Sequence, residues 1–430
     1  MGAIGLQTWT DGERRETQRA RLRAMAADVL AGNTFYKEKL GAAGVTRPEQ
    51  LVAGWDALPF TTKTELSADQ AAHAPWGRNL TYPLERYVRM HQTSGTTGRP
   101  LRILDTAESW AWWAGIWADL IYGAAGVTAA DRVYFAFSFG PFIGFWSAFA
   151  GAERLGALCI SGAAQSTPER LQSIVASGAT VILSTPTYAL RLAEVAREET
   201  VDLERSALRV SIHAGEPGAS IPATRERIES GLGVVAFDHT GATEIGPTGF
   251  SCEARDGVHL VEREFIAEVL DPASGEVAED GEGELVLTNL GRWGWPVIRY
   301  RTGDRVRLER GRCACGRTWA KLAGGIVARA DDMVIVRGVN VFPSAIESIV
   351  RGLDGVAEYR VEAYEERGMV ELRVIVEPLP GIAGGIRDGV AEALHRSLGI
   401  RCAVDLAEPG ALPRFELKAK RFVRVEAKRP

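Results

Sequence analysis

The chain has 430 residues, more than one hydrophobic core usually supports, so we expect two or three domains. Its composition, with 46% hydrophobic and 24% charged residues, is typical of a globular protein and excludes disordered and fibrous classes. Fifty basic residues stand against 55 acidic ones, and this formal charge of -5 argues against nucleic acid and anionic lipid as partners.

The cysteine count and the N-terminal region bear on the compartment. Five cysteines are too few, and odd in number, for a disulfide framework, which favours the reducing cytoplasm. Arginines of region 13–32 are interleaved with acidic residues, which transit peptides avoid, so we expect a surface helix there. The uncharged stretch 133–152 is long enough to span a bilayer, but Gly140-Pro141 in its middle favours a buried strand, a turn and a helix. We therefore expect no membrane span.

Short apolar runs alternate with amphipathic helical patterns in the first half of the chain. Helices are predicted at 106–122, 144–154, 187–199 and 219–230, and strands at 132–137, 156–160, 179–184, 208–213 and 234–238. This alternation predicts an α/β fold in which helices cover both faces of a largely parallel sheet. Ligands of such sheets bind at the carboxyl ends of the strands.

The pattern changes twice further along. Segments 259–272 and 284–290 alternate as an antiparallel hairpin does, so we expect a β-rich subdomain at about 250–328. The remainder predicts a small α+β unit, with helices at 343–352 and 385–397 and strands at 356–364, 370–378 and 402–406. We therefore expect a large N-terminal domain over 1–330 and a small C-terminal domain over 331–430.

Three small-residue loops are candidates for chemistry. The loop TSGTTGRP at 93–100 combines glycines, which let backbone N–H groups approach a polyphosphate, with hydroxyl donors. It lacks Walker A spacing, and on its own it fits a plain turn equally well. The turns HAGEP at 213–217 and DHTGATE at 238–244 follow predicted strands, and Glu244 is a candidate magnesium ligand. Taken singly, both turns fit helix N-caps as well.

The order of these loops along the chain resembles the adenylate-forming superfamily, specifically its branch of phenylacetate:coenzyme A ligases. The resemblance rests on FYKEKLGAAGV, TSGTTGRP, GAERLGA, TPTYALRLAE, DHTGATEIGP, VIRYRTGD, CACGR, RADDMVIVRGVNVFPSAIE and LPRFELKAKR, and so covers nearly the whole chain. It implies that ATP and an aromatic carboxylate give an acyl adenylate and pyrophosphate, and that the thiol of coenzyme A then displaces AMP. Mg²⁺ would accompany ATP.

The resemblance also assigns roles to residues. Those around the ATP phosphates are Ser94, Thr96, Thr97, Gly98 and Thr243, with Glu244 holding Mg²⁺. Those around the nucleoside are Ala214, Gly215, Glu216 and Asp238 for adenine, and Asp304 with Arg329 for ribose. Lys418, chosen over Lys420, would bridge the carboxylate and the α-phosphate, a site of developing charge. The C-terminal domain that carries it would rotate between the two half-reactions about a hinge at Asp331.

Four positions depart from the family pattern. Thr240 stands where a tyrosine normally stacks on adenine, and Ala328 and Leu417 replace glycines before Arg329 and Lys418. Arg99 stands where lysine is common. None of the four removes a reacting group.

Cysteine and histidine spacing suggests a metal site. Cys313 and Cys315 form a compact C-x-C-G unit, and Cys252 and His259 offer two more ligands from the neighbouring β-rich region. Four such ligands suit tetrahedral structural Zn²⁺, with free cysteines as the alternative. Cys159 and Cys402 are predicted core residues.

The acid pocket is the least determined part. Aromatic residues crowd the end of the strand at 132–137 and the following helix, and we assign Phe142 to an aromatic-lined pocket for a planar acid. Two alternatives stay open: an adenylating enzyme that serves a carrier-protein thiol or an amine, and a catalytically weak homologue that binds a nucleotide or adenylate. A homodimer also stays open, because the sequence does not decide the oligomeric state.

Overall fold

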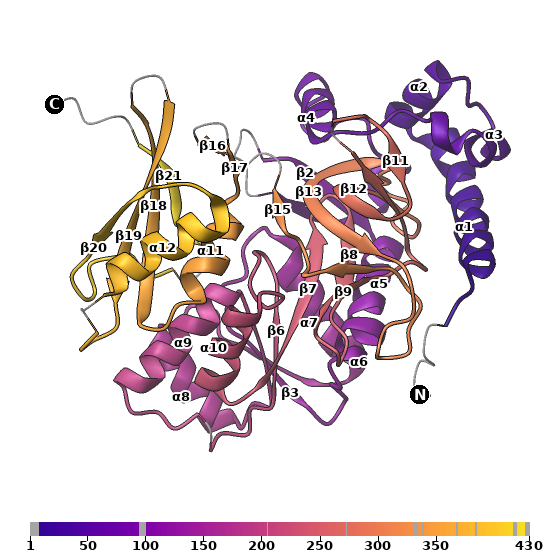
Figure 1. Cartoon of the computed structure of the whole chain (residues 1–430). Helices are drawn as coiled ribbons and strands as arrows, with labels where there is room; N and C mark the ends of the chain where they lie inside the picture. Colours follow the sequence, from indigo (N-terminus) through magenta and orange to yellow (C-terminus); the bar gives the residue numbers. More distant parts are fainter. Residues whose placement is uncertain are drawn as a thin grey trace.

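One large mixed sheet organises most of the chain. The structure, a computed structural model, describes residues 8–93, 100–203, 205–271, 273–329, 334–336, 339–366, 369–382, 385–415 and 419–425. Within these residues, a 13-stranded sheet runs in the order β11-β10-β12-β13-β14-β9-β8-β7-β6-β5-β3-β4, with β15 paired to β13. Figure 1 shows this sheet at the centre, the N-terminal helices on one side and the C-terminal unit on the other.

The first elements pack against the antiparallel end of this sheet. They are the helices α1 (Asp11–Gly32), α2 (Thr34–Ala42), α3 (Pro48–Ala53) and α4 (Lys63–Ala72), followed by the strands β1 (Tyr87–Gln92) and β2 (Arg102–Thr106). Helix α1 starts at a capping box in which Thr10 and Glu13 satisfy each other's backbone N–H groups. Strands β1 and β2 pair antiparallel on either side of residues 93–101.

The predicted βαβ alternation is confirmed, and it contains one helix, α8, that was not predicted. It comprises α5 (Ala107–Ile116), a π-helical turn (Trp117–Ile121), α6 (Tyr122–Ala124), β3 (Arg132–Phe135), α7 (Ile143–Leu155), β4 (Leu158–Ser161), α8 (Thr167–Ser177), β5 (Val181–Ser184), α9 (Pro186–Glu198), β6 (Val210–His213), α10 (Pro222–Leu232) and β7 (Val235–Ala242). Strands β4, β3, β5, β6 and β7 are parallel neighbours.

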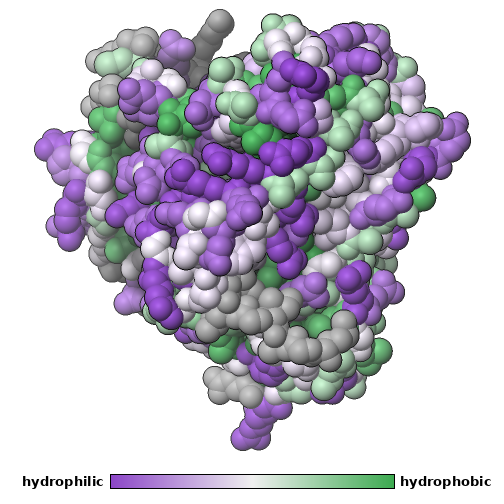
Figure 2. All heavy atoms as spheres, turned by 90° about the vertical axis from the view of Figure 1, so that its right-hand side faces the viewer, coloured by the Kyte–Doolittle hydropathy of each residue, from purple (hydrophilic) through white to green (hydrophobic). Residues whose placement is uncertain are grey.

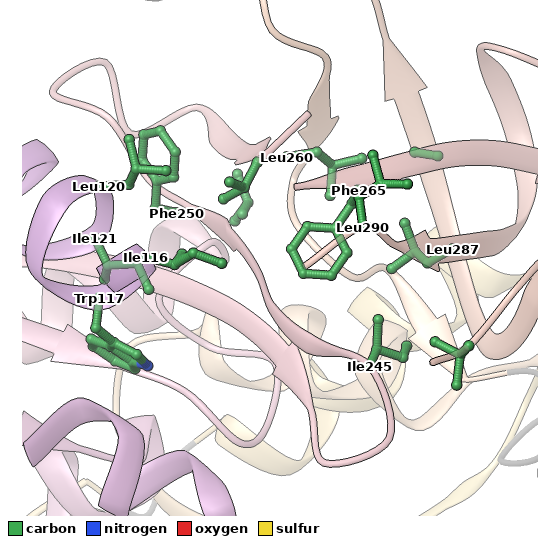
Figure 3. Packing of buried hydrophobic residues seen from close by; sticks show 14 of the residues in the cluster. Ile116, Trp117, Leu120, Ile121, Ile245, Phe250, Leu260, Phe265, Leu287 and Leu290 are labelled. Atoms are coloured by element: carbon green, nitrogen blue, oxygen red, sulfur yellow. The ribbon is translucent and has the colours of Figure 1, made fainter. Parts of the chain in front are cut away.

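Helices cover both faces of the parallel strands, as predicted. Alternate residues of one strand enter different cores: Val181 and Leu183 join the cluster that contains Trp117, whereas Ile182 joins the cluster formed with α8, α9 and α10. This period of two is the expected consequence of strand geometry. Figure 3 shows part of the first cluster, where Leu120 lies beside Phe250 of the antiparallel strands.

The β-rich region is continuous with the parallel sheet, because β7 pairs with β6 on one side and with β8 on the other. It contains β8 (Gly246–Phe250), β9 (Gly257–Leu260), β10 (Phe265–Leu270), β11 (Val277–Ala278), β12 (Gly281–Asn289), β13 (Tyr300–Glu309), β14 (Lys321–Ala323) and β15 (Ala328–Arg329). The expected hairpin is the antiparallel pair β10–β12. Residues 257–260 form a separate strand, β9, which pairs with β8 and β14.

The last elements form a unit with its own core. They are β16 (Val334–Val336), β17 (Val339–Val341), α11 (Pro343–Arg351), β18 (Val356–Glu366), β19 (Met369–Pro378), α12 (Ile386–Leu398), β20 (Ala403–Leu406) and β21 (Phe422–Arg424). Their buried apolar residues make a third cluster within 334–404. Figure 1 shows this unit above α9 and α10, and the Arg227 guanidinium of α10 donates to the carbonyl of Val356 at 3.1 Å.

Among the described residues, no helix is both long enough and apolar enough to cross a membrane. The face drawn in Figure 2 is mainly hydrophilic, and its hydrophobic residues occur in small groups. The stretch 133–152 is β3, a turn and α7, as predicted from Gly140-Pro141.

Candidate active site

The sheet brings several predicted site residues to one place. A small cavity lies where the end of β7 meets β13. Its lining includes Thr240, Gly241, Ala242, Thr302 and Asp304, together with apolar side chains of β12 and β14. Thr240, which stands where the family has a stacking tyrosine, lines this cavity, and its hydroxyl lies 3.2 Å from that of Thr248. The end of β7 thus borders a cavity, whereas residues 213–217 are not among those that line it, and the ligand of this cavity remains a prediction.

Asp304 and Arg329 form an ion pair at this cavity. They are direct partners in the antiparallel pair β13–β15, and Arg329 Nη1 donates to Asp304 Oδ1 at 2.8 Å. The Asp304 N–H donates to the Thr302 hydroxyl at 2.9 Å, which fixes the turn of the chain. Ala328, in place of the family glycine, is buried and pairs with Arg305 in the same register. The structure thus brings together the two residues expected at the ribose.

Asp238 is a buried carboxyl on β7. Its oxygens accept hydrogen bonds from the Ser220 hydroxyl and, at 3.0 Å, from the N–H of His239. Burial raises its pKa to about 6, although both hydrogen bonds act in the opposite direction. The carboxylate is therefore bound to protein donors, and its place at the adenine remains a prediction.

The turn after β6 carries the predicted residues Ala214, Gly215 and Glu216. Gly215 has a φ of +96°, a conformation that favours glycine. The Glu216 carboxylate accepts the N–H of Thr187 at 2.9 Å and the N–H of Ala419 at 3.0 Å. Its side chain therefore links the start of α9 to the C-terminal unit, a role that the sequence did not indicate.

Thr243 and Glu244 follow β7 directly. The Glu244 carboxylate is largely buried and lies 3.0 Å from the Nζ atom of Lys63, on α4. Such a carboxylate is a chemically suitable Mg²⁺ ligand when phosphate oxygens complete the coordination. Lys63 was not predicted, because no local pattern links α4 to the turn after β7.

Two further residues missed by sequence reasoning support Thr243. The Arg292 guanidinium donates to the carbonyl of Thr243 at 2.7 Å and to both carboxylate oxygens of Asp105 at 2.7 and 2.6 Å. Both charged side chains are fully buried. They are 187 positions apart in the sequence, so their pairing has no sequence signature.

Several predicted residues lie outside the described part of the chain. They are Ser94, Thr96, Thr97, Gly98 and Arg99 of the glycine-rich loop, the hinge position Asp331, and Leu417 with Lys418. Their roles remain predictions from the sequence.

Aromatic side chains cluster at the end of β3 and the start of α7. Phe137 stacks on Phe145 with ring centroids 3.7 Å apart, and Phe139 packs against Phe149. Phe142 is half-buried and immediately precedes α7. The expected aromatic surroundings are present, and the contact of Phe142 with an acid remains a prediction.

Cys252, His259, Cys313 and Cys315 converge beside β9 and β14, with their ligand atoms within 4.8 Å of one another. The Cys252 and Cys313 sulfurs lie 3.8 Å apart, and Cys315 Sγ lies 3.5 Å from His259 Nε2. A tetrahedral Zn²⁺ with ordinary bond lengths separates two sulfurs by about 3.8 Å and sulfur from nitrogen by about 3.5 Å. The donors therefore fit zinc, and His259 Nδ1 lies 2.9 Å from the carbonyl of Trp319, which leaves Nε2 for a metal.

Comparison with known proteins identifies the family. Residues 17–291 match the AMP-binding enzyme family, and residues 338–425 match the AMP-binding enzyme C-terminal domain. A phenylacetate-coenzyme A ligase of Aromatoleum evansii is 34% identical over 427 residues, covering 96% of this chain and 94% of the relative.

Solved structures extend the likeness to the fold. A 2-hydroxyisobutyryl-CoA ligase in the postadenylation state, in complex with R3-HIB-AMP, is 30% identical and covers 97% of this chain and 91% of its own, with a TM-score of 0.91. The same ligase in the thioesterification state gives 0.72 at 31% identity, covering 98% of this chain and 91% of its own. The arrangement of this chain is thus closer to the postadenylation form. The chain belongs to the AMP-binding, adenylate-forming enzyme family and, within it, to the branch that includes the phenylacetate-coenzyme A ligases.

Proposed function

We propose that the protein activates an aromatic carboxylic acid with ATP as an acyl adenylate and transfers the acyl group to coenzyme A. The observation that carries this proposal is the likeness to phenylacetate-coenzyme A ligase over 96% of the chain. The pairing of Asp304 on β13 with Arg329 on β15 supports it, because these side chains suit the hydroxyls of a ribose. Activation replaces a poor leaving group, the carboxylate oxygen, with AMP.

Each predicted residue has a place in this reaction. Ser94, Thr96, Thr97 and Gly98 bind the β- and γ-phosphates, and Thr243 contacts the α-phosphate. Glu244 binds Mg²⁺, which would replace Lys63 as the counter-ion of this carboxylate. Asp304 accepts hydrogen bonds from the ribose, and the turn at 214–216 with Asp238 borders the adenine. Phe142 contributes to the acid pocket.

Lys418 supplies a positive charge that acts during adenylation. Its ammonium group bridges the substrate carboxylate and the α-phosphate, where negative charge moves between oxygens in the transition state. We place the domain boundary at Asp331, between a domain over 1–330 and a domain over 331–430. Rotation about Asp331 carries Lys418 away before coenzyme A attacks, so that one site serves two half-reactions.

We further propose that Cys252, His259, Cys313 and Cys315 bind one structural Zn²⁺. The match of their separations to tetrahedral zinc supports this role. The site joins β9 and the segment after β8 to the loop before β14, and four protein ligands leave no position for a substrate. Free thiols and a zinc thiolate site both suit a reducing compartment, so we place the reaction in the cytoplasm.

Product analysis tests the proposed function. The protein is incubated with Mg-ATP and a panel of aryl and arylacetic acids, with and without coenzyme A, and the products are identified by mass spectrometry. An aryl-CoA that requires ATP is the expected product. An adenylate that accumulates regardless of coenzyme A would point to a carrier-protein thiol or an amine as acceptor. Absence of both products for every acid would contradict an aromatic acid ligase.

A further inference from the structure

Two carboxylates outside the C-terminal unit contact the chain on either side of residues 416–418. Before this segment, Arg414 binds Glu194 of α9: Nε lies 3.2 Å from each carboxylate oxygen, and Nη2 lies 3.0 Å from Oε1. After it, Ala419 donates its N–H to Glu216 at 3.0 Å. Arg414 and Ala419 thus each contact a carboxylate of the large N-terminal part of the chain.

The C-terminal unit fixes Arg414 independently of Glu194. Glu377 of β19 accepts hydrogen bonds from the Arg414 guanidinium, one of them at 3.0 Å from Nη1, and Nη1 also donates to the carbonyl of Leu412 at 3.0 Å. The same Glu377 carboxylate accepts the N–H groups of Gly410 and Leu412 at 2.9 and 3.1 Å. The guanidinium is therefore oriented from within its own unit, and Glu194 is a partner that it can lose without losing its position.

Helix α9 carries the residues that meet these parts of the C-terminal unit. Glu194 lies in its last half and also binds Arg191 at 2.7 Å, so this carboxylate keeps a counter-ion when Arg414 leaves. At the start of α9, the Thr187 N–H holds Glu216 in place, and the Thr187 hydroxyl accepts from Arg421 Nη1 at 3.1 Å. Arg421 in turn belongs to the segment after Ala419. One helix thus meets the chain both before and after Lys418.

We infer that Glu194 and Glu216 are positioning residues that select the arrangement for acid activation by tethering Arg414 and Ala419 of the C-terminal unit. This inference rests on the proposed function. Both carboxylates precede Asp331 whereas Arg414 and Ala419 follow it, so a rotation about Asp331 separates the partners. The contacts occur in a structure whose arrangement is closer to the postadenylation than to the thioesterification form of a related ligase. The tethers therefore favour adenylation over thioester formation.

Half-reaction kinetics of the Glu194→Gln variant test this inference. The substitution removes the charge from a side chain that is 26% exposed, so the fold is retained. We expect the kcat for adenylate formation to fall about fivefold while the KM for ATP and for the acid stays unchanged. Thioester formation from pre-made adenylate is not slowed. Glu198→Gln is the matched control, because Glu198 lies on the same helix, is 55% exposed and pairs with Arg191.

Conservative variants and raised ionic strength distinguish a positioning role from a merely structural one, because a structural role predicts none of the following differences in the rate of adenylation. Glu216→Gln keeps an acceptor for the Ala419 N–H and should retain more adenylation than Glu216→Ala. Arg414→Lys keeps the charge but not the forked geometry and should fall between wild type and Glu194→Gln. Raising the ionic strength should slow wild-type adenylation towards the rate of Glu194→Gln, which itself responds less.

Lys418→Ala separates failure of the tether from failure of the proposed function. If Lys418→Ala leaves adenylation intact, the proposed role of this lysine is wrong. If Lys418→Ala abolishes adenylation but Glu194→Gln behaves as Glu198→Gln does, the tether is wrong and the proposed function stands. Equal losses of both half-reactions in Glu194→Gln would show a structural role and would also overturn the tether.

Discussion

The guanidinium of Arg292 connects the buried carboxylate of Asp105 to the backbone carbonyl of Thr243. It donates to Asp105 Oδ1 and Oδ2 at 2.7 and 2.6 Å and to the Thr243 carbonyl at 2.7 Å. Asp105 stands in β2, just after the glycine-rich loop, and Thr243 begins the turn after β7. The strand that follows the glycine-rich loop is therefore connected to the turn after β7 through one buried ion pair.

Asp105→Asn should destabilise the protein strongly, because it leaves the buried Arg292 charge without a counter-ion. Loss of one partner of a buried ion pair costs about 3–5 kcal/mol. The free energy of unfolding, measured with urea, should fall by about that amount, and adenylate formation should slow because Thr243 loses a rigid support. Glu108→Gln breaks an exposed pair with Arg86 and should change stability little. Equal losses of unfolding free energy in the two variants would show that the buried Asp105–Arg292 pair is no more important for stability than an exposed pair.

Elements that depend on local sequence patterns were predictable, whereas contacts between distant segments were not. The strands and helices of the βαβ region were predictable because period-two and helical patterns are local, and the structure confirms them. Helix α8 was not predicted, although Ser166 and Glu169 form a capping box at its start.

Ion pairs between distant segments were not predictable. The partners are 187 positions apart in the pair Arg292–Asp105 and 220 positions apart in the pair Arg414–Glu194. In the sequence, each of these residues resembles an ordinary surface charge. The proximity of Asp304 to Arg329 was expected, by contrast, because the family resemblance assigned both to one ligand group. Cys252 and His259 were joined to Cys313 and Cys315 by ligand chemistry, and the structure brings the four together.

Asp304→Asn should weaken binding of ATP. A charge-assisted hydrogen bond to a hydroxyl contributes about 1.5–3 kcal/mol, so the KM for ATP should rise by about tenfold or more. The KM for the acid should change little, because the proposed contact is with ribose. The control is Arg307→Gln, on the same strand, whose side chain is 60% exposed and pairs with Glu309. An unchanged KM for ATP in Asp304→Asn would mean that Asp304 does not contact the ribose and only fixes the turn and binds Arg329.

Removal of zinc should destabilise the protein more than it slows catalysis. Elemental analysis of the purified protein should find one zinc ion per chain, and Cys313→Ser should lose it and lower the Tm. Cys402→Ser is the control, since Cys402 is a half-buried cysteine of the C-terminal core, away from the metal cluster. A wild-type protein that contains no metal and keeps its full Tm after treatment with a chelator would end the zinc proposal.

The last prediction concerns the pH dependence of stability at Glu358, on β18. Its carboxylate accepts from Arg421 Nε at 2.7 Å, from Arg351 Nη2 at 3.0 Å and from the N–H of Tyr359 at 2.8 Å. Burial alone would raise the pKa of this carboxyl, but Arg351 and Arg421 outweigh burial and lower it to about 2. The ordinary value is 4.5, so the ionised form is stabilised in the folded protein.

A lowered pKa stabilises the fold above the unfolded value and loses that contribution as the pH falls towards the folded value. Glu358→Gln should therefore reduce the free energy of unfolding by about 3 kcal/mol at pH 7, and this difference should shrink between pH 4.5 and pH 2. Urea unfolding followed by circular dichroism at pH 7, 4.5 and 3 measures it. Glu392→Gln, which breaks the exposed pair with Arg396, is the control and should show little difference at any pH. A difference for Glu358→Gln that stays constant from pH 7 to pH 3 would mean that packing, and not ionisation of the carboxyl, makes Glu358 stabilising.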